Sequence, residues 1–330
     1  MDSAETKFEA NSDVNSGGVL IALPALLANG LLAQIKQIFT FPQGYYRMHD
    51  LFILIGLVVL LRIKTIEGIK QLEPGEFGKL LGLDRIPEIQ TIRSKIAFMS
   101  ELKKSGEWSS ELSKNWFSED NEYSGIAYID GHVRIYYGSQ TKLPRRYSSR
   151  LRLCMPGITD YWVNDVLGRP FFYTSSVVNN GLIAVMKSEI IPRLKKEIPN
   201  QPSDSELEIK KKLSRFTIVF DREGYSPEFI YDLFRKERIS CVTYKKYADE
   251  AWPEKEFQKI TVQMPHGENI IMKLAERELK LGEFKQKDEP ADIFIVREIR
   301  KLTETGHQTS IITSDYISDM GRLAAVMFSR

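Results

Sequence analysis

Cysteine is scarce in this sequence. Cys154 and Cys241 are its only two cysteines, they lie far apart, and they form no Cys-x-x-Cys pair. A disulfide framework or a cysteine-based zinc site needs more thiols or closer ones. We therefore expect two reduced thiols in a cytoplasmic protein.

Long apolar runs are scarce as well. Leu51–Leu61 is apolar throughout but only 11 residues long, whereas a membrane-spanning helix needs about twenty. Val14–Gln34 carries no charge, but it is interrupted by asparagine, glycine and proline, and acidic residues precede it. A secretory signal peptide would begin with basic residues. Both segments are expected to be core helices of an N-terminal bundle with no membrane contact; a membrane hairpin is the alternative.

An excess of either charge is also absent. The 46 basic residues nearly cancel the 44 acidic ones and leave a net charge of +2. Contact with nucleic acid would therefore have to depend on a local cluster of charge. The apolar fraction of 42% and the length of 330 residues fit a globular chain of two or three domains.

The pattern along the chain changes from helical to strand-like near residue 116. We expect a disordered polar tail at 1–16 and a helical domain at 17–115, in which Ile89, Ile92, Ile96 and Met99 repeat at helical spacing. The helix with this spacing also carries basic residues, and a short helix closed by Gly82 precedes it. Two helices joined by a glycine turn are compatible with a helix-turn-helix or with any helical hairpin. A domain at 116–330 contains short β-rich segments, interrupted by a charged insertion at about 246–305.

One of these β-rich segments carries an acid in its middle. In "AYIDGHVRIYYG" (127–138), Asp130, Gly131 and His132 separate two strand-like runs. An Asp-Gly pair is a strong signal for a hairpin turn, which would need no function. The alternative is that Asp130 holds a metal ion, with His132 on the same face of the strand as a packed residue or a contact to the site.

A second acid follows the most apolar strand. "FTIVF" (216–220) is apolar enough to be a central strand buried on both faces, and Asp221 follows it directly. Ser226 and Pro227 then provide the start of a helix. The carboxyl ends of strands in open α/β sheets are where ligands bind. If the strands of Asp130 and Asp221 are neighbours, the two carboxylates would bind Mg²⁺ together with phosphate oxygens; a simple turn-forming role for Asp221 is the alternative.

Basic and aromatic residues follow the first acid. Residues 131–159 contain no Asp or Glu, and Tyr136, Tyr137 and Tyr147 lie among their basic side chains. Basic groups neutralise phosphates and aromatic rings stack on exposed bases; a solvated basic loop is the alternative. The candidate DNA contacts in this segment are Arg134, Lys142, Arg145, Arg146, Arg150 and Arg152, and those beside the second acid are Arg222 and Tyr225.

Four strings resemble one protein family along essentially the whole chain. "AYIDGHVRIYYGSQTKLPRRY", "TDYWVND", "FDREGYSPEFI" and "GHQTSIIT" are similar to bacterial insertion-sequence transposases of the DDE type. The resemblance implies an RNase H-like fold, in which the first and fourth strands are neighbours. It also implies that Asp130 and Asp221 are the first two catalytic acids. Mg²⁺, which Mn²⁺ can replace, would be the cofactor.

The third acid of that family has no counterpart here. The resemblance places a Glu in a Tyr-x2-Arg-x3-Glu pattern on the helix after the last strand, with Met327 at the Tyr place and Arg330 at the Arg place. The Glu would lie four residues beyond Arg330, and Glu298 and Glu304 precede the final strand, so neither matches. We therefore expect a chain truncated before this acid, with weak or no cleavage activity.

The expected fold is α/β: an RNase H-like mixed sheet with a β-rich insertion, preceded by an all-helical N-terminal domain. The expected function is transposition: binding of element-end DNA, by a homodimer on paired ends, with Mg²⁺-dependent strand cleavage and transfer. The first alternative is a catalytically dead DNA-binding remnant of a transposase. The second is an RNase H-like repair or RNA nuclease, which would need neither the helical domain nor the insertion.

Overall fold

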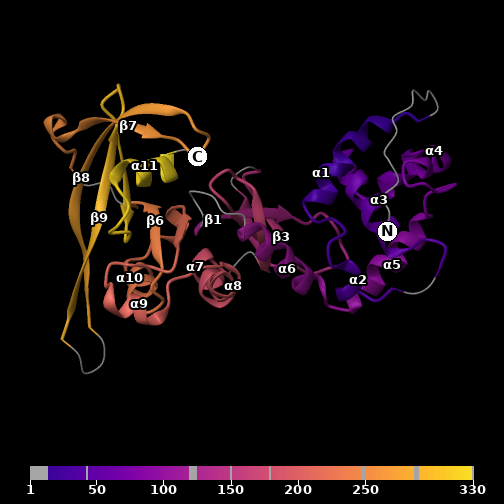
Figure 1. Cartoon of the computed structure of the whole chain (residues 1–330), viewed down its shortest axis with the longest axis horizontal. Coiled ribbons are helices and arrows are strands. Elements are labelled where there is room, and N and C mark those ends of the chain that lie inside the picture. Colours follow the sequence, from indigo (N-terminus) through magenta and orange to yellow (C-terminus); the bar gives the residue numbers. More distant parts are fainter. Residues whose placement is uncertain are drawn as a thin grey trace. The chain divides into compact units, whose positions relative to one another are not determined.

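The structure is a computed structural model, and it describes residues 14–41, 44–118, 125–148, 151–177, 180–246, 250–285 and 290–328. The chain divides into two compact units, Met1–Leu112 and Ser113–Arg330. Both can be followed by colour in Figure 1. Each unit is described separately below.

The first unit is built from helices in its described part. They are two 3-10 helices, Gly17–Ala22 and Ile66–Gln71, and the α-helices α1 (Leu23–Ala28), α2 (Ile35–Ile38), α3 (Met48–Leu60), α4 (Pro74–Lys79) and α5 (Ile89–Glu101); α6 (Ser105–Phe117) begins here. The apolar segment expected to be a core helix is α3, whose Leu51, Leu54 and Leu57 are fully buried. Among the described residues, no helix has the length and apolarity needed to cross a membrane.

The periodic segment forms α5 as expected. Ile92 is buried, and Ile96 and Met99 pack against the same core. Gly82, between α4 and α5, has φ +67°, in the left-handed region that glycine enters at little cost. The structure therefore contains the predicted short helix, glycine turn and longer helix. Both a helix-turn-helix and a plain helical hairpin fit this arrangement.

Replacing Gly78 by Ala is expected to destabilise the first unit. A Cβ at Gly78 would lie 2.6 Å from the Cα of Arg85 and 2.8 Å from the carbonyl oxygen of Leu83, and these backbone atoms cannot move aside. We expect a loss of about 1–3 kcal/mol of stability, measured by urea unfolding. The matched control is Gly75→Ala in the same helix, where a Cβ would make an ordinary 3.6 Å contact with the carbonyl oxygen of Asp84. Equal effects of the two variants would contradict the packing argument.

The second unit is a large mixed sheet with helices, so the expected α/β class is confirmed. The strands are β1 (Ile126–Ile135), β2 (Arg145–Ser148), β3 (Leu153–Asn164), β4 (Pro170–Val177), β5 (Thr217–Phe220), β6 (Ser240–Tyr244), β7 (Gln258–Gln263), β8 (Asn269–Phe284), β9 (Asp292–Leu302) and β10 (Gln308–Thr313). Their order is β2-β3-β1-β5-β6-β10-β9-β8-β7, with β4 paired to β3. Strands β1, β5 and β6 are parallel, and the other neighbours are antiparallel.

The stretch around Asp130 is one continuous strand, so both the hairpin turn and the division into two strands are wrong. β1 runs through Asp130, Gly131 and His132, which pair with Trp162, Tyr161 and Asp160 of β3. A Cβ at Gly131 would lie 3.1 Å from the Tyr161 ring. Glycine at this position thus lets the ring pack against the strand, and the twelve-residue partner β3 supplies the hydrogen bonds that a turn would have interrupted.

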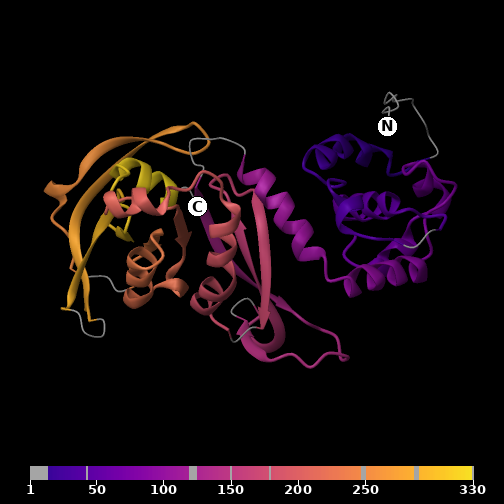
Figure 2. The same ribbon diagram turned by 60° about the horizontal axis from the view of Figure 1, so that its bottom comes forward.

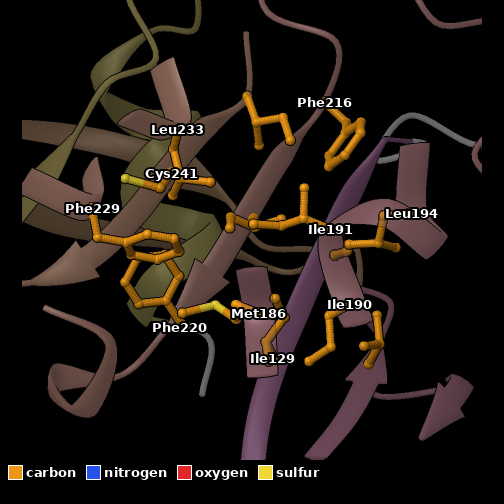
Figure 3. Packing of buried hydrophobic residues seen from close by; sticks show 14 of the residues in the cluster. Ile129, Met186, Ile190, Ile191, Leu194, Phe216, Phe220, Phe229, Leu233 and Cys241 are labelled. Carbon is orange, nitrogen blue, oxygen red and sulfur yellow. The ribbon is translucent and has the colours of Figure 1, made fainter. Parts of the chain in front are cut away.

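The strand of "FTIVF" is central and buried, as predicted. All four residues of β5 are buried, between β1 on one side and β6 on the other. Ile129, Phe220 and Cys241 face one side of the sheet, where they pack with Met186, Leu194 and Phe229 (Figure 3). The helices on this side are α7 (Leu182–Val185), α8 (Ile191–Glu197), which follows a π-helical turn, and α10 (Pro227–Arg235); α9 (Asp204–Ile209) lies in the loop before β5. Ser226 caps α10 through Phe229 N, as its sequence predicted.

The opposite side of the sheet is covered by α11 (Met320–Phe328). Tyr128 and Val219 point to this side and pack with Leu323, Val326 and Met327 of α11. Strands β7 and β8 contact the same helix through Val262, Met272 and Leu274. Figure 2 shows β7–β9 curving around α11. The segment expected as an insertion therefore extends the main sheet instead of standing apart from it.

A network of buried charges connects this extension to the centre of the sheet. The Glu298 carboxylate on β9 accepts hydrogen bonds from Lys245 Nζ at 2.9 Å, Arg300 Nε at 2.8 Å and Ser310 Oγ at 2.8 Å. The Arg300 guanidinium also lies over the Trp252 ring, 4.2 Å from its centroid. Burial raises the pKa of Glu298, but these hydrogen bonds outweigh it and place the pKa below its ordinary value.

The cysteines are both free thiols, as expected. Cys154 is exposed and Cys241 is buried. Burial raises the pKa of Cys241 to about 12, although Ser314 partly offsets the shift by hydrogen bonding. Cys241 is therefore an unreactive core residue at neutral pH.

Candidate metal and nucleic-acid site

The two predicted acids follow directly paired residues on neighbouring parallel strands. The last pair between β1 and β5 joins Ile129 to Phe220, and Asp130 and Asp221 come next on each strand. Asp221 is still extended, with φ −80° and ψ −175°. Side chains alternate along a strand and neighbouring strands lie about 4.8 Å apart. This alternation directs both side chains to the face opposite Ile129 and Phe220, which is the face of α11.

Local hydrogen bonds orient both acids. The Asp221 carboxylate accepts a hydrogen bond from Glu223 N at 2.9 Å. The backbone carbonyl oxygen of Asp221 accepts another from Thr243 Oγ1 at 3.1 Å. The Asp130 carboxylate accepts one from Gly131 N at 3.1 Å. Asp130 is exposed and Asp221 is partly buried. The pair is thus held by the backbone and remains accessible to a ligand.

The helix expected to carry the third acid lies on the same face. Tyr128, two residues before Asp130, donates a hydrogen bond from its hydroxyl to the carbonyl oxygen of Val326 in α11. Met327, at the Tyr place of the family pattern, is buried against the sheet. Arg330 lies outside the described residues. The carboxyl-terminal turn of α11 is therefore fixed beside the strand that bears Asp130.

Other acids near the end of the chain have structural partners. Asp315 accepts hydrogen bonds from Ile317 N and from Ser318 N and Oγ, and Asp319 caps α11 through Arg322 N at 2.8 Å. Glu298 belongs to the buried network described above. Within the described part of the chain, no group of three His, Cys, Asp or Glu side chains could hold a metal ion.

A cleft of about 720 Å³ lies beside residues that follow the acids in the sequence, although neither acid is among its lining residues. Its lining includes Arg134 and Arg146 from the predicted DNA contacts, Tyr137 and Tyr147, and Glu223, two residues beyond Asp221. β2, which the sequence analysis did not predict, carries Arg145, Arg146 and Tyr147 and pairs with β3. The structure therefore places part of the basic segment in one cleft with Gly131, the residue after Asp130, and with Glu223.

The remaining predicted contacts differ in their placement. Lys142, Arg145 and Arg152 are exposed outside the lining of the cleft, and Arg150 lies outside the described residues. The Arg222 guanidinium lies 5.7 Å from the centroid of the Tyr244 ring. Tyr225 is partly buried against the main core.

Two arginines of the basic segment have acidic partners. Arg134 Nε lies 2.9 Å from the nearly buried Asp160 carboxylate, and Arg146 lies 3.2 Å from Glu223. Residues 131–159 contain no acid, but two of their arginines are still neutralised, because the acidic partners Asp160 and Glu223 lie outside this segment. His132 is exposed on the face of Asp130, so its interpretation as a packed residue is wrong.

The sequence analysis missed an aromatic pair on the face of the acids. Trp162 pairs with Asp130 across β1 and β3, and Tyr173 pairs with Trp162 across β3 and β4. The two rings are stacked, with centroids 5.0 Å apart and planes 30° apart. The sequence "YWV" (161–163) could have predicted this position, because side chains alternate along a strand and Trp162 must point away from the buried Tyr161 and Val163.

Comparisons with known proteins identify the class. Residues 1–330 match the family described as "Transposase protein". The chain belongs to this family of transposases. One solved structure, the cryo-EM structure of a piggyBac transposase synaptic complex with hairpin DNA, is similar at 12% identity and a TM-score of 0.34; the match covers 99% of this chain and 58% of that chain. No curated protein matches the chain.

Proposed function

We propose that this transposase chain binds the DNA at the ends of its element and catalyses Mg²⁺-dependent strand cleavage and transfer. The observation that carries the proposal is the placement of Asp130 and Asp221 directly after the paired residues Ile129 and Phe220 of the parallel neighbouring strands β1 and β5. The proposed setting is a homodimer on paired DNA ends in the cytoplasm.

An RNase H-like sheet is the fold proposed for this centre. β1 is the first strand, and β5 is the fourth when the edge strand β2, which pairs with β3, is left out; β1 and β5 are parallel neighbours. That neighbour relation is the one the RNase H-type sheet requires. Strands β3 and β4 continue antiparallel on the other side of β1. The strand order therefore supports the specific fold as well as the α/β class.

The donor set of the site fits a hard divalent cation. Two carboxylates at one point provide the oxygen ligands that Mg²⁺ or Mn²⁺ prefers, and phosphate oxygens of DNA supply others. When bound, such ions activate water or a DNA 3′-hydroxyl for in-line attack on a phosphodiester. Asp130 and Asp221 would hold the ions, and the basic residues of the cleft would position the phosphate backbone.

Cleavage by this chain is proposed to be slow. Asp130 and Asp221 contribute two carboxylates, while Asp315, Asp319 and Glu298 are already held by structural partners. An ion at the edge of the pair would then depend on water and phosphate for most of its ligands, and its position would be poorly fixed. The small number of carboxylates also favours the alternative function, a catalytically dead transposase remnant that binds DNA without cleaving it.

The DNA-binding part of the proposal is tested by replacing Arg145 and Arg146 together with Ala. Removing one bound phosphate from the interface should reduce the slope of log affinity against log salt by about 0.9. The slope of the double variant should therefore fall by up to about 1.8, with weaker binding to many sequences. Fluorescence anisotropy with a labelled duplex at several salt concentrations measures both effects.

Lys211→Ala with Lys212→Ala is the matched control. These lysines are also adjacent; they are exposed and lie in the loop before β5. Their removal changes the net charge by the same amount. The control should leave the slope nearly unchanged. If both double variants lower the slope equally, the effect belongs to overall charge, and Arg145 and Arg146 are not part of the DNA interface.

A further inference from the structure

We propose that Trp162 and Tyr173 form a platform on which an unpaired DNA base stacks beside the cleaved phosphate. The inference rests on the proposed function for the nature of the ligand. It concerns residues that neither the motifs nor the family match assigns. The juxtaposition behind it is a cross-strand row of Tyr173, Trp162 and Asp130, with Asp221 directly after the neighbouring strand β5.

The row follows from the strand pairing. Directly paired residues of neighbouring strands point to the same face, and the pairs are Tyr173 with Trp162 and Trp162 with Asp130. Each step between strands is about 4.8 Å. The indole therefore begins about one strand spacing from Asp130, which is a distance that one nucleotide can bridge between its phosphate and its base.

The exposure of the rings distinguishes the platform from an ordinary packed pair. Trp162 is 36% exposed and Tyr173 is 51% exposed. An isolated exposed aromatic residue needs no explanation, but here two stacked rings share the face of the two acids and the row of Asp130. Aromatic faces that remain open to solvent can accept a base of any sequence by stacking.

The polar neighbours of the platform suit a nucleic-acid strand. Asp160, the next residue of β3 on this face, is neutralised by Arg134 at 2.9 Å and accepts a hydrogen bond from Ser175 Oγ at 2.5 Å. The Arg134 side chain is still 58% exposed and can approach a phosphate. An unpaired strand brings its bases to the rings, whereas a duplex keeps them stacked inside. The occupant is therefore single-stranded DNA.

The test compares two DNA probes that have the same phosphates. One is a labelled oligonucleotide of twelve thymidines, and the other is the same strand with abasic sites in its centre. Binding is measured in EDTA with the full chain carrying Asp130→Asn and Asp221→Asn, so that neither metal ions nor carboxylate repulsion contributes. In this background the chain should prefer the thymidine strand by roughly 5- to 150-fold.

Trp162→Ala should remove most of this preference and leave the salt slope unchanged, because stacking releases no counterions. Trp162→Phe should restore part of it, and Tyr45→Ala, which removes an exposed ring from the first unit, should leave it intact. The circular dichroism spectrum of each variant checks the sheet.

Three results would overturn the inference: an unchanged preference in Trp162→Ala, an equal loss of affinity for duplex DNA, or no preference in the starting chain. Failure of the proposed function has a different signature. In that case, the chain with both acids intact would not bind Mg²⁺, or the arginine variant would keep its salt slope, whatever the result with Trp162.

Discussion

Replacing Asp221 or Asp130 by Asn is expected to lower the affinity of the chain for Mg²⁺ or Mn²⁺ by tenfold or more. Each carboxylate supplies a charged oxygen ligand to the same ion, and an amide oxygen is a weaker, neutral substitute. Titration calorimetry with Mn²⁺ measures the affinity directly. The slow Mg²⁺-dependent nicking of a supercoiled plasmid should disappear in both variants.

Thermal unfolding provides a second measurement of the same site. A ligand at ten times its dissociation constant stabilises the native state by about 1.4 kcal/mol, so Mg²⁺ should raise the melting temperature of the unaltered chain but not of either variant. Without metal, the variants should be at least as stable as the parent, because one of two neighbouring negative charges is removed. Their loss of metal binding could then not be attributed to unfolding.

Glu208→Gln is the matched control, since Glu208 is an exposed acid on the loop helix α9. It should bind Mn²⁺ as the parent does. If Asp130→Asn binds Mn²⁺ with the parent's affinity, the two acids do not share an ion. If both acid variants retain nicking, another residue performs the reaction and the proposed centre is wrong.

Glu298→Ala is expected to cost about 3–5 kcal/mol of stability, the largest change in stability of any substitution proposed for this chain. The Glu298 side chain is 3% exposed, and its partners Lys245 and Arg300 are 7% and 4% exposed. Removing the carboxylate would leave two buried cations without their shared anion. Urea unfolding followed by circular dichroism measures the loss.

Glu254→Ala is the control, because it removes a carboxylate from an exposed ion pair. Its partner Lys273 Nζ lies 3.0 Å away, but Glu254 is 74% exposed. Such a pair contributes between zero and about 1 kcal/mol. Similar losses in the two variants would show that the Glu298 network is not desolvated as its burial indicates.

The pH dependence of stability has a defined sign. Because the pKa of Glu298 is below its ordinary value in the folded chain, its contribution is present above the unfolded pKa of about 4.3 and is lost as the pH falls through the folded value. Between neutral and strongly acidic pH, the parent should therefore lose more stability than Glu298→Gln. If the stability of the parent and of Glu298→Gln falls equally with pH, the ionised Glu298 carboxylate makes no such contribution.

Local sequence determined several elements of this protein. The apolar residues of α3, the periodic isoleucines of α5, the run that forms β5 and the Ser226 cap of α10 were all predicted, because these structures depend on neighbours within a few residues. The two candidate acids were also found locally, since each stands in or directly after a strand with strong β propensity. The family match over the whole chain agrees with the expectation of a transposase.

Pairing between distant segments decided the rest. The path of β1 through Asp130 could not be distinguished from an Asp-Gly turn until β3 was in place, because the missing hydrogen bonds come from residues about 30 positions away. The strand β2 and the ion pairs Arg134–Asp160 and Arg146–Glu223 depend on the same register. Trp162 and Tyr173 were ordinary strand residues in the sequence. Only the pairing of β4, β3, β1 and β5 placed them in one row with Asp130 and on the face of both acids, because side-chain proximity across a sheet is set by register and not by distance along the chain.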